Sequence, residues 1–337
     1  MRVTIIMPVY NNTRDLPECL SAVKAAAKKR DCEIVVVDDA STDDTPRVAA
    51  SMGVRVLRLE KNSGPGAARN FGARHASGDI LFFVDSDVVV APDVVDRVVG
   101  VFDSRPDVAA VFGSYDARPR AQGLVSQYRN LLHHFVHQHG NPEASTFWAG
   151  CGAIRRDIFL GVGGFDAEQY ARPSIEDIEL GYRLRRAGHR ILLDRDIQGT
   201  HLKRWKLRGV IWTDIVCRAI PWSRLILSSR ETPNDLNVKL SQRVSGALVV
   251  LAALTLPLAL WRIGLLVLPL VALVSVVVLN RDLFTFLARQ RGVAFAVACV
   301  PLHLLYFLYS VLSYVFVRVE TGIRDLMSRP DGALRRS

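Results

Sequence analysis

The stretch that decides the fold is Asp79-Ile80-Leu81-Phe82-Phe83-Val84-Asp85-Ser86-Asp87. Its five consecutive apolar residues, bounded by acidic residues, predict a buried β-strand over 80–84. Because alternate residues of a strand point to the same face, we expect Asp85 and Asp87 to face one crevice at its carboxyl end. Two carboxylates this close supply the oxygen ligands that Mg²⁺ or Mn²⁺ uses when it carries a diphosphate. The alternative is a polar strand end that begins an ordinary turn.

Further strands and helices alternate on both sides of this stretch. The other expected strands cover 3–7, where Pro8 ends the strand, 33–37, 55–59 and 191–194. The expected helices begin at Leu16, cover 45–52, and run from the Ala-rich stretch after Gly66 to about Ala76. Such alternation predicts an α/β fold in which crossover helices join the strands of a mostly parallel sheet.

Polar residues follow three of these strands at the same expected edge of the sheet. They occupy positions 8–12, 38–39 and 85–87. In open α/β sheets ligands bind at this edge, so the pattern predicts a nucleotide pocket, where a carboxylate can accept the N3–H of uracil. Arg69 lies in the first turns of a helix after Gly64-Pro65-Gly66, where backbone N–H groups and the helix dipole favour a phosphate. Taken alone, Arg69 is better explained as a solvated helix residue.

Four motifs, in this order, resemble those of the family 2 glycosyltransferases with the GT-A fold. They are Pro8-Val9-Tyr10-Asn11, Val37-Asp38-Asp39-Ala40-Ser41-Thr42-Asp43, Asn62-Ser63-Gly64-Pro65-Gly66-Ala67-Ala68-Arg69-Asn70-Phe71-Gly72 and Asp85-Ser86-Asp87. The resemblance covers roughly residues 1 to 205. It implies the GT-A fold and the usual chemistry of the family, which is inverting transfer of a sugar from a nucleotide donor.

The resemblance also implies roles for individual residues. Asp39 would bind uracil, Asp38 would help to shape the pocket, and Arg69 would approach the diphosphate. Asp87 would be a metal ligand, with Asp85 near the ribose or the metal. The whole expected donor site comprises Pro8, Tyr10, Asn12, Asp38, Asp39, Asn62, Gly66, Arg69, Asp85, Ser86 and Arg204.

The acceptor half, residues 116–206, contains a second acidic motif at Glu176-Asp177. A helix is expected to open here with Ser174 as its cap, and capping alone could explain the acidic residues. Inverting transfer needs a general base within hydrogen-bond reach of the acceptor oxygen. The motif resembles the Glu-Asp motif of the family, which assigns the base to Asp177; with a phosphate acceptor, Asp177 would mainly orient it. The expected acceptor residues are Trp148, Gly150, Cys151, Glu176 and Trp205.

Histidines cluster in the stretch 124–140, which reads as an amphipathic helix. His133 and His137 are four residues apart, a spacing that could suit a metal, but no acidic residue joins them. We therefore expect a solvated or membrane-facing helix here.

The segment His201-Leu202-Lys203-Arg204-Trp205 resembles the Gln-x-x-Arg-Trp motif of membrane-bound synthases such as cellulose and hyaluronan synthases. Histidine replaces the glutamine, which argues against processive synthesis. By resemblance, His201 could be a third metal ligand beside Asp85 and Asp87, Arg204 could neutralise the diphosphate, and Trp205 could stack on an acceptor sugar. The alternative for Arg204-Trp205 is a basic and aromatic pair at a membrane interface.

Composition points to a membrane enzyme. Half of the 337 residues are hydrophobic (50%), the net charge is +10, and the mean hydropathy is +0.18. The charge fits a membrane surface or anionic substrates; nucleic acid is not expected as a partner, because the basic residues lie largely beside apolar segments. Five scattered cysteines without C-x-x-C spacing indicate a reducing compartment and no structural zinc. The chain has neither a G-x-G-x-x-G nor a P-loop motif, which excludes Rossmann dehydrogenases and P-loop enzymes.

The expected organisation is a glycosyltransferase domain followed by membrane segments. The domain covers 1–206, with a nucleotide-sugar half at 1–115 and an acceptor half at 116–206. Amphipathic interfacial helices are expected over 207–240. Transmembrane helices are expected within 241–320, at about 244–261, 263–279 and 293–317, and a basic tail covers 321–337. No signal peptide is expected at the N-terminus, which places the catalytic domain in the cytoplasm and the chain in the inner (plasma) membrane. Three spans would put the basic tail outside, against the positive-inside rule, so a re-entrant third segment stays open.

The predicted activity is metal-dependent, inverting glycosyl transfer from a UDP-sugar to a lipid-linked or surface-glycan acceptor, with Mg²⁺ or Mn²⁺ as the cofactor. Within this class, the alternatives are a polyprenyl-phosphate sugar synthase and a processive polysaccharide synthase. From another class, the alternative is a sugar nucleotidyltransferase, which would carry a Gly-rich loop with Arg and Lys after the first strand. That place holds Val9-Tyr10-Asn11-Asn12.

Overall fold

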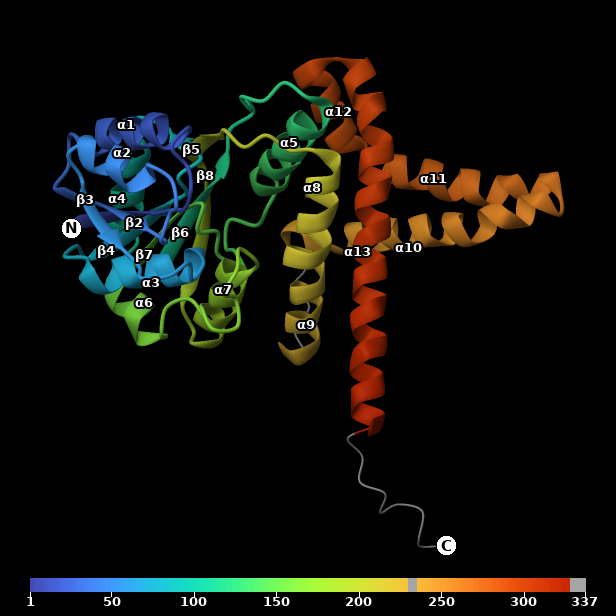
Figure 1. The fold of residues 1–337 in the computed structure, drawn as a ribbon. Helices are drawn as coiled ribbons and strands as arrows, with labels where there is room; N and C mark the ends of the chain where they lie inside the picture. Colours follow the sequence, from blue (N-terminus) through green and yellow to red (C-terminus); the bar gives the residue numbers. More distant parts are fainter. Residues whose placement is uncertain (230–234, 328–337) are drawn as a thin grey trace, which may run out of the picture. The chain divides into compact units, whose positions relative to one another are not determined.

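The computed structural model describes residues 1–229 and 235–327 of the chain. It divides into two compact units (Figure 1). The first unit contains Met1–Lys206 and the short segment Asp235–Asn237, and the second contains Leu207–Asn234 and Val238–Ser337. Asp235–Asn237 falls in the stretch expected to be interfacial, yet Leu236 lies in the core of the first unit.

The first unit is built on an eight-stranded mixed sheet. Its strands are β1 (Val3–Val9), β2 (Cys32–Asp38), β3 (Arg55–Arg58), β4 (Ile80–Val84), β5 (Val88–Val90), β6 (Val108–Tyr115), β7 (Cys151–Arg155) and β8 (Arg190–His201), in the spatial order β3-β2-β1-β4-β7-β6-β8-β5. Strands β3, β2, β1 and β4 are parallel, whereas β7 runs antiparallel to both β4 and β6. The predicted α/β fold is confirmed.

Helices cover both faces of this sheet (Figure 1). They are α1 (Leu16–Ala27), α2 (Thr45–Ser51), α3 (Pro65–His75), α4 (Val94–Ser104), α5 (Leu124–Gln138), α6 (Arg156–Gly161) and α7 (Glu176–Arg186). Alternate residues of β4 serve the two faces: Phe82 packs in the core under α1 and α4, and Phe83 in the core under α3, α6 and α7. Both rings are fully buried, which contributes roughly 1.5–3 kcal/mol each.

The predicted strand over 80–84 is confirmed, but it ends at Val84, so Asp85 and Asp87 lie in the turn between β4 and β5. The argument from strand alternation therefore does not apply to these two carboxylates, and their facing one crevice stays a prediction. The turn itself sets their directions. Strand β5, only three residues long, was not predicted because so short a run carries no readable period.

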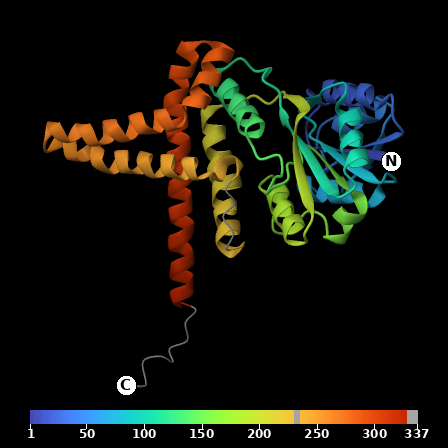
Figure 2. The same cartoon turned by 180° about the vertical axis from the view of Figure 1, so that it is seen from behind.

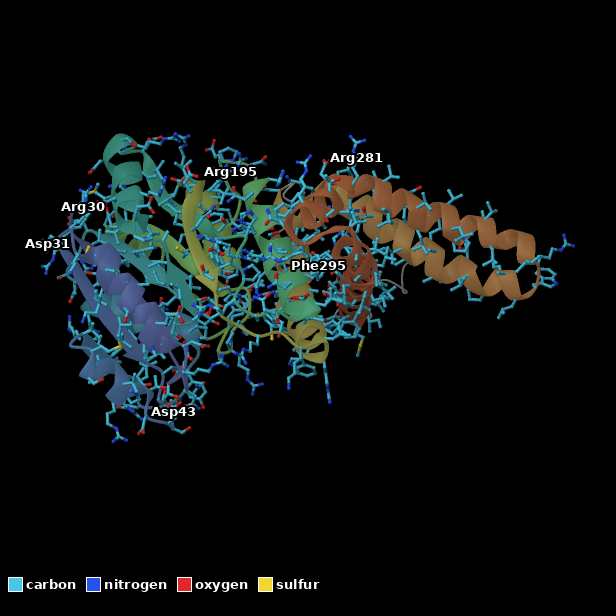
Figure 3. All side chains as sticks on the ribbon, turned by 90° about the horizontal axis from the view of Figure 1, so that it is seen from above. Arg30, Asp31, Asp43, Arg195, Arg281 and Phe295 are labelled. Atoms are coloured by element: carbon cyan, nitrogen blue, oxygen red, sulfur yellow. The ribbon has the colours of Figure 1, made fainter. Side chains whose placement is uncertain are left out.

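The first strand also differs from its prediction, because β1 continues through Pro8 to Val9. Pairing with β4 stops at Ile6, and from there β1 pairs only with β2. A proline has no N–H to donate, and it is tolerated where one side of the strand needs no partner. In Figure 3, Arg30 and Asp31 label the loop that leads into β2, and Asp43 labels the loop that follows it.

Gly113 shows how closely β6 and β8 approach each other. A Cβ on Gly113 would lie 1.8 Å from the backbone oxygen of Ile197, whereas a Cβ on Gly100 in α4 would meet nothing within 4 Å. We expect Gly113→Ala to lower the free energy of unfolding by about 1–3 kcal/mol or more, since backbone must move. Gly100→Ala should instead raise it by roughly 0.5–1 kcal/mol. Thermal unfolding of both variants in detergent checks this, and equal midpoints would contradict it.

The second unit is helical throughout its described residues. Its elements are α8 (Leu207–Trp212), a π-helical turn (Thr213–Ala219), α9 (Ile220–Ser229), α10 (Leu240–Thr255), two 3₁₀ turns (Leu256–Leu260 and Ile263–Leu266), α11 (Val267–Leu279), α12 (Arg281–Arg291) and α13 (Val293–Met327). A 3₁₀ turn at Leu236–Val238 leads into α10. Helices α10 and α11 lie side by side in both views (Figures 1 and 2).

By length and composition, two helical stretches of this unit could cross a membrane: Leu240–Leu260 and Val293–Met327. The segments Ile263–Leu279 and Arg281–Arg291, bent by 66°, would make a third if they count as one span. Helix α13 runs on to Met327 and so exceeds the predicted span of 293–317. Of the predicted basic tail, 321–327 is helical, while 328–337 and the predicted linker residues 230–234 lie outside the described part of the chain.

Polar contacts join the helices of the second unit. The Asn280 amide nitrogen donates to Ser245 Oγ at 3.0 Å, and its oxygen accepts from Gln242 at 3.1 Å. Elsewhere the Tyr309 hydroxyl donates to Asp214 at 2.6 Å. These bonds fix α10 against the start of α12 and the π-helical turn against α13.

Candidate active site

Asp39 fixes the loop that precedes α3. Its two carboxylate oxygens accept the backbone N–H groups of Ser63 at 2.7 Å and Gly64 at 2.9 Å. Burial raises the pKa of Asp39 above its ordinary value, although these two bonds oppose the shift. Because a carboxylate has about four acceptor positions, two remain for further donors. Gly64 is required here: its φ is +86°, and a Cβ would lie 2.5 Å from the oxygen of Ala171.

The neighbouring Asp38 holds the loop that follows β2. It is fully buried, accepts the N–H of Ser41 at 3.3 Å and pairs with Arg58 at 3.0 Å. The Asn62 amide donates to the backbone oxygen of Asp39 at 3.4 Å. These contacts tie Asp38 to the loop that follows β2 and Asn62 to the backbone of Asp39, and a role of Asp38 in shaping a nucleotide pocket stays a prediction.

Asn12 connects the end of β1 to the turn after β4. Its amide nitrogen donates to the backbone oxygen of Ser86 at 3.0 Å and to the Ser86 hydroxyl at 3.2 Å. Two other expected donor-site residues precede Asn12 in the sequence: the Tyr10 side chain is 47% exposed, and Pro8 is buried within β1. Two of the predicted donor-site segments thus meet directly.

Arg69 has a role that the sequence did not indicate. Its side chain is buried, and its two terminal nitrogens contact different acidic loops, Asp85 at 2.6 Å and Glu176 at 3.1 Å. Gly66, one turn earlier in α3, lies against Glu176. Burial raises the pKa of Asp85 although Arg69 opposes the shift. One guanidinium therefore joins the donor-side and acceptor-side acidic motifs.

Asp87 and His201 come together at 3.4 Å, between Asp87 Oδ2 and His201 Nε2. Burial raises the pKa of Asp87, but its contact with His201 and the nearby charge of Lys203 outweigh burial and hold it low. A carboxylate and an imidazole nitrogen are suitable ligands for Mn²⁺, so the pair fits a cation. Among residues 1–229 and 235–327, no group of three or more His, Cys, Asp and Glu side chains could hold a metal ion. Asp85, which is also an expected ligand, contacts Arg69 through Oδ1, and its role at a cation stays a prediction.

Asp177 lies at the start of α7, next to a segment that also contacts Asp85. Asp177 Oδ2 accepts the N–H of Ala149 at 3.1 Å, and the Asp85 N–H donates to the Gly150 oxygen at 3.1 Å. Burial, reinforced by the neighbouring Glu176, raises the pKa of Asp177 to about 7. A carboxyl group with this pKa can accept a proton near neutral pH.

The predicted Ser174 cap is wrong. Helix α7 begins at Glu176 and has no side-chain cap, and the Glu176 carboxylate instead accepts the N–H of Ser174 at 2.9 Å. The physical reason is that Glu176 must also reach Arg69, which holds its carboxylate in this position.

The expected acceptor residues Trp148, Gly150 and Cys151 lie at the start of β7. A Cβ on Gly150 would lie 2.5 Å from the Trp148 ring, so the glycine lets the indole lie flat on the backbone. Cys151 is fully buried and pairs with Val84 in the sheet, which makes it part of the core. Strand β7 was not predicted, because five residues that include a glycine are too short for a strand pattern.

The segment after β8 carries Arg204 and Trp205. Arg204 is exposed, and the Lys203 ammonium lies 4.4 Å from the Trp205 ring centroid. The Trp205 N–H donates to Ser126 Oγ at 2.7 Å, and the Ser126 hydroxyl donates back to the Trp205 oxygen at 3.1 Å. Trp205 is therefore tied to α5.

Helix α5 forms where it was expected, but its predicted solvated or membrane-facing histidines are wrong for His133 and His137. Burial lowers the pKa of His137 to about 4 and that of His133 well below its ordinary value, so both rings are neutral. His133 packs against Tyr115 at 4.3 Å and Trp148 at 4.8 Å between ring centroids. A neutral imidazole can pack in a core like other aromatic rings. The sequence did not identify Tyr115, Ser126 or Asn130 as neighbours of the site, although the i, i+4 spacing of the last two on one helix face was readable.

Residues 4–162 match the family model described as Glycosyl transferase family 2. The first unit belongs to glycosyltransferase family 2. This glycosyltransferase domain is 34% identical over 207 residues to a dolichol-phosphate mannosyltransferase of Pyrococcus furiosus, an alignment that covers 60% of this chain and 54% of that protein. The chain thus spans about half the length of that curated relative.

Solved structures share the fold of the glycosyltransferase domain and its following helices. The mannosyltransferase PcManGT of Pyrobaculum calidifontis, solved with GDP-Man and Mn²⁺, is 19% identical with a TM-score of 0.60, covering 93% of this chain and 86% of that one. Residues 1–349 of Staphylococcus aureus TarS, solved with UDP-GlcNAc, are 19% identical with a TM-score of 0.53, covering 96% of this chain and 92% of that one. The fold is therefore GT-A, with long apolar helices after it.

Proposed function

We propose that this chain is an inverting glycosyltransferase (EC 2.4) that moves a sugar from a nucleotide-sugar donor to an acceptor at a membrane. The observation that carries the proposal is that Arg69 and the segment 148–150 join two acidic motifs of different character. Asp87, beside His201, has a lowered pKa, and Asp177 has a raised one. Inverting transfer requires two such groups, a charged one near the leaving group and a base for the acceptor.

The donor is proposed to be a UDP-sugar that binds where β1, β2 and β4 end. Asp39 accepts the N–H of the base, Asp38 and Asn62 shape the pocket, and Asn12 and Ser86 close it toward the diphosphate. Names of similar proteins support a nucleotide sugar without fixing its base, since PcManGT was solved with GDP-Man and TarS with UDP-GlcNAc. Arg204, which is exposed, is proposed to neutralise charge on the diphosphate.

Asp87 and His201 are proposed to hold Mg²⁺ or Mn²⁺, which when bound neutralises charge on the leaving diphosphate. Arg69 binds Asp85 and so fixes the turn 85–87, which carries Asp87. The support is the donor set itself, with a carboxylate and an imidazole nitrogen 3.4 Å apart.

Asp177 is proposed as the general base. It takes the proton of the acceptor hydroxyl as the acceptor oxygen bonds to the anomeric carbon. The bond from that carbon to the diphosphate breaks, and the diphosphate leaves with its electron pair on the opposite face. The N–H groups of Ala149 and Ile178 hold Asp177 in place. Trp148 and Trp205 offer aromatic faces to the acceptor.

The acceptor is proposed to be lipid-linked, because two candidate spans, or three with the bent pair, follow the glycosyltransferase domain. The named activity of the Pyrococcus relative favours a polyprenyl-phosphate sugar synthase as the second candidate. Incubating the full chain in membranes with labelled UDP-glucose, UDP-GlcNAc or GDP-mannose tests this. Label from one donor should enter the lipid extract; long insoluble polymer would identify a processive synthase, and no labelled product from any donor would contradict the proposal.

Removing the cation should abolish transfer. We expect EDTA to stop the reaction, Mn²⁺ or Mg²⁺ to restore it, and Asp87→Asn to weaken Mn²⁺ binding by about 10- to 100-fold because one of two ligands is lost. Asp166→Asn, which changes an acidic residue outside the site, is the matched control and should behave as wild type. Full activity of the Asp87 variant, or of the EDTA-treated protein, would exclude this role for Asp87.

A further inference from the structure

The imidazole of His201 is held by a side chain of α5. Asn130 Oδ1 lies 2.6 Å from His201 Nδ1, and both residues are almost fully buried, at 1% and 5% exposure. With the amide oxygen toward the ring, this contact can be a hydrogen bond only if Nδ1 carries the proton, because the oxygen can only accept. The opposite nitrogen, Nε2, is then the atom that faces Asp87.

A second contact fixes the plane of the same ring. Tyr115, at the end of β6, stacks on His201 with ring centroids 4.2 Å apart and an interplanar angle of 6°. The stack stops the imidazole from tilting, and the bond to Asn130 stops it from rotating about its own axis. Together they aim Nε2 at one point.

The same helix holds the other end of the segment 201–205. Ser126, one turn before Asn130 in α5, exchanges two hydrogen bonds with the backbone of Trp205. The two anchors are four residues apart on the helix, and their two partners are four residues apart in the following segment. Helix α5 therefore acts as a template for the piece of chain that carries His201.

The amide nitrogen of Asn130 is buried and, within the described part of the chain, has no hydrogen-bond partner. A buried donor without a partner destabilises a fold, and an apolar residue of similar size would avoid that loss. The presence of asparagine is better explained by what its oxygen does for His201 than by its contribution to the core.

We propose that Asn130 is a positioning residue for the cation site: it sets the tautomer of His201 so that Nε2 offers its lone pair beside Asp87. Metal-binding histidines commonly donate their other ring N–H to such an acceptor, which fixes the tautomer and raises ligand basicity. The role as a cation ligand rests on the proposed function, whereas the setting of the tautomer does not.

Nitrogen-15 NMR of the histidine-labelled full chain in detergent, free of metal and above pH 8, tests the tautomer. The His201 signal is assigned by its loss in His201→Gln. We expect the Nδ1–H form in wild type and in Asn130→Asp, which keeps an acceptor, and the Nε2–H form in Asn130→Leu, where Asp87 becomes the nearer acceptor. Two outcomes would overturn the proposal. One is an Nε2–H ring in wild type, which the reversed amide orientation of Asn130 would produce. The other is a tautomer in Asn130→Leu that is the same as in wild type.

Binding of Mn²⁺ with UDP, followed by electron paramagnetic resonance, gives the second measurement. Asn130→Leu should weaken it by about 10- to 100-fold while its unfolding midpoint stays at or above that of wild type, a combination that a purely structural role would not give. Asn130→Asp should stay closer to wild type than Asn130→Leu does. Unchanged binding in Asn130→Leu would overturn the role at the cation site.

Gln138→Leu is the matched control on the same helix. Its amide donates to Ser114 and to the backbone of Arg195, both at 2.9 Å, and not to His201. It should change neither the tautomer nor Mn²⁺ binding. If wild type itself fails to bind Mn²⁺ with UDP, the proposed function fails, while the comparison of tautomers still decides whether Asn130 sets the ring.

Discussion

Asp177→Asn is expected to lower the rate of sugar transfer to a hydroxyl acceptor by about 10²- to 10⁴-fold, the usual contribution of a general base. The amide is close in size to the carboxylate and can still accept one N–H, so the contact with Ala149 or Ile178 is retained. What it loses is the ability to take a proton. Binding of the nucleotide, which Asp177 does not contact in the proposed mechanism, should change little.

The pH dependence of the wild-type reaction follows from the same residue. Burial raises the pKa of Asp177 to about 7, and only the ionised form is a base. The rate should therefore rise tenfold per pH unit below pH 7 and level off above it. In Asp177→Asn the residual rate should lose this rise. Initial rates from pH 5.5 to 8.5, for both proteins, measure the difference.

Glu179→Gln is a suitable control for the base. Glu179 lies in the same first turn of α7, but its carboxylate pairs with Arg183 at 2.7 Å. Its rate and pH profile should match those of wild type. An Asp177→Asn variant that retains more than a tenth of the wild-type rate would mean that no base is needed, as expected for a phosphate acceptor, and would assign Asp177 to orienting the acceptor.

The sequence was most informative where a pattern is local. The apolar run 80–84 identified the central strand. Four motifs identified the family, because glycines, acidic residues and a proline at fixed spacings determine the structure of a loop locally. Strands β5, β6 and β7 were not predicted, because each forms by pairing with a segment that is far away in the sequence. Ladders of this kind leave little trace in a single segment.

The candidate site was predictable residue by residue but not as a set of contacts. The acidic residues were all singled out, yet which of them share a partner depends on where Arg69 lies after folding. The buried histidines of α5 show the same limit, because His137 follows an ordinary amphipathic pattern and only tertiary packing removes it from water. Asn130 was missed because an asparagine within a helix has no motif around it.

Arg69→Met is expected to cost the first unit about 3–5 kcal/mol of folding free energy, the usual loss when one partner of a buried ion pair is removed. The Arg69 and Glu176 side chains are 5% and 7% exposed, so the change leaves the Glu176 carboxylate buried without its cation. Arg69→Lys should rescue little, because one ammonium cannot reach two carboxylates as a planar guanidinium does. Chemical unfolding in detergent, followed by tryptophan fluorescence, measures the loss.

The double variant Arg69→Met/Glu176→Gln separates charge from packing. If the loss arises from an unpaired buried charge, neutralising Glu176 should restore most of the stability, since the amide can still accept the N–H of Ser174. Arg47→Met, which removes an exposed ion pair with Asp44, is the control and should leave the unfolding midpoint nearly unchanged. Should the double variant be no more stable than Arg69→Met, the arginine would stabilise the fold through its packing on Phe165, and not by joining the two acidic motifs. If the double variant regains stability, its rate of sugar transfer shows whether catalysis needs Asp85 and Glu176 to share the Arg69 guanidinium. In that variant the fold is kept while both ion pairs of Arg69 are absent.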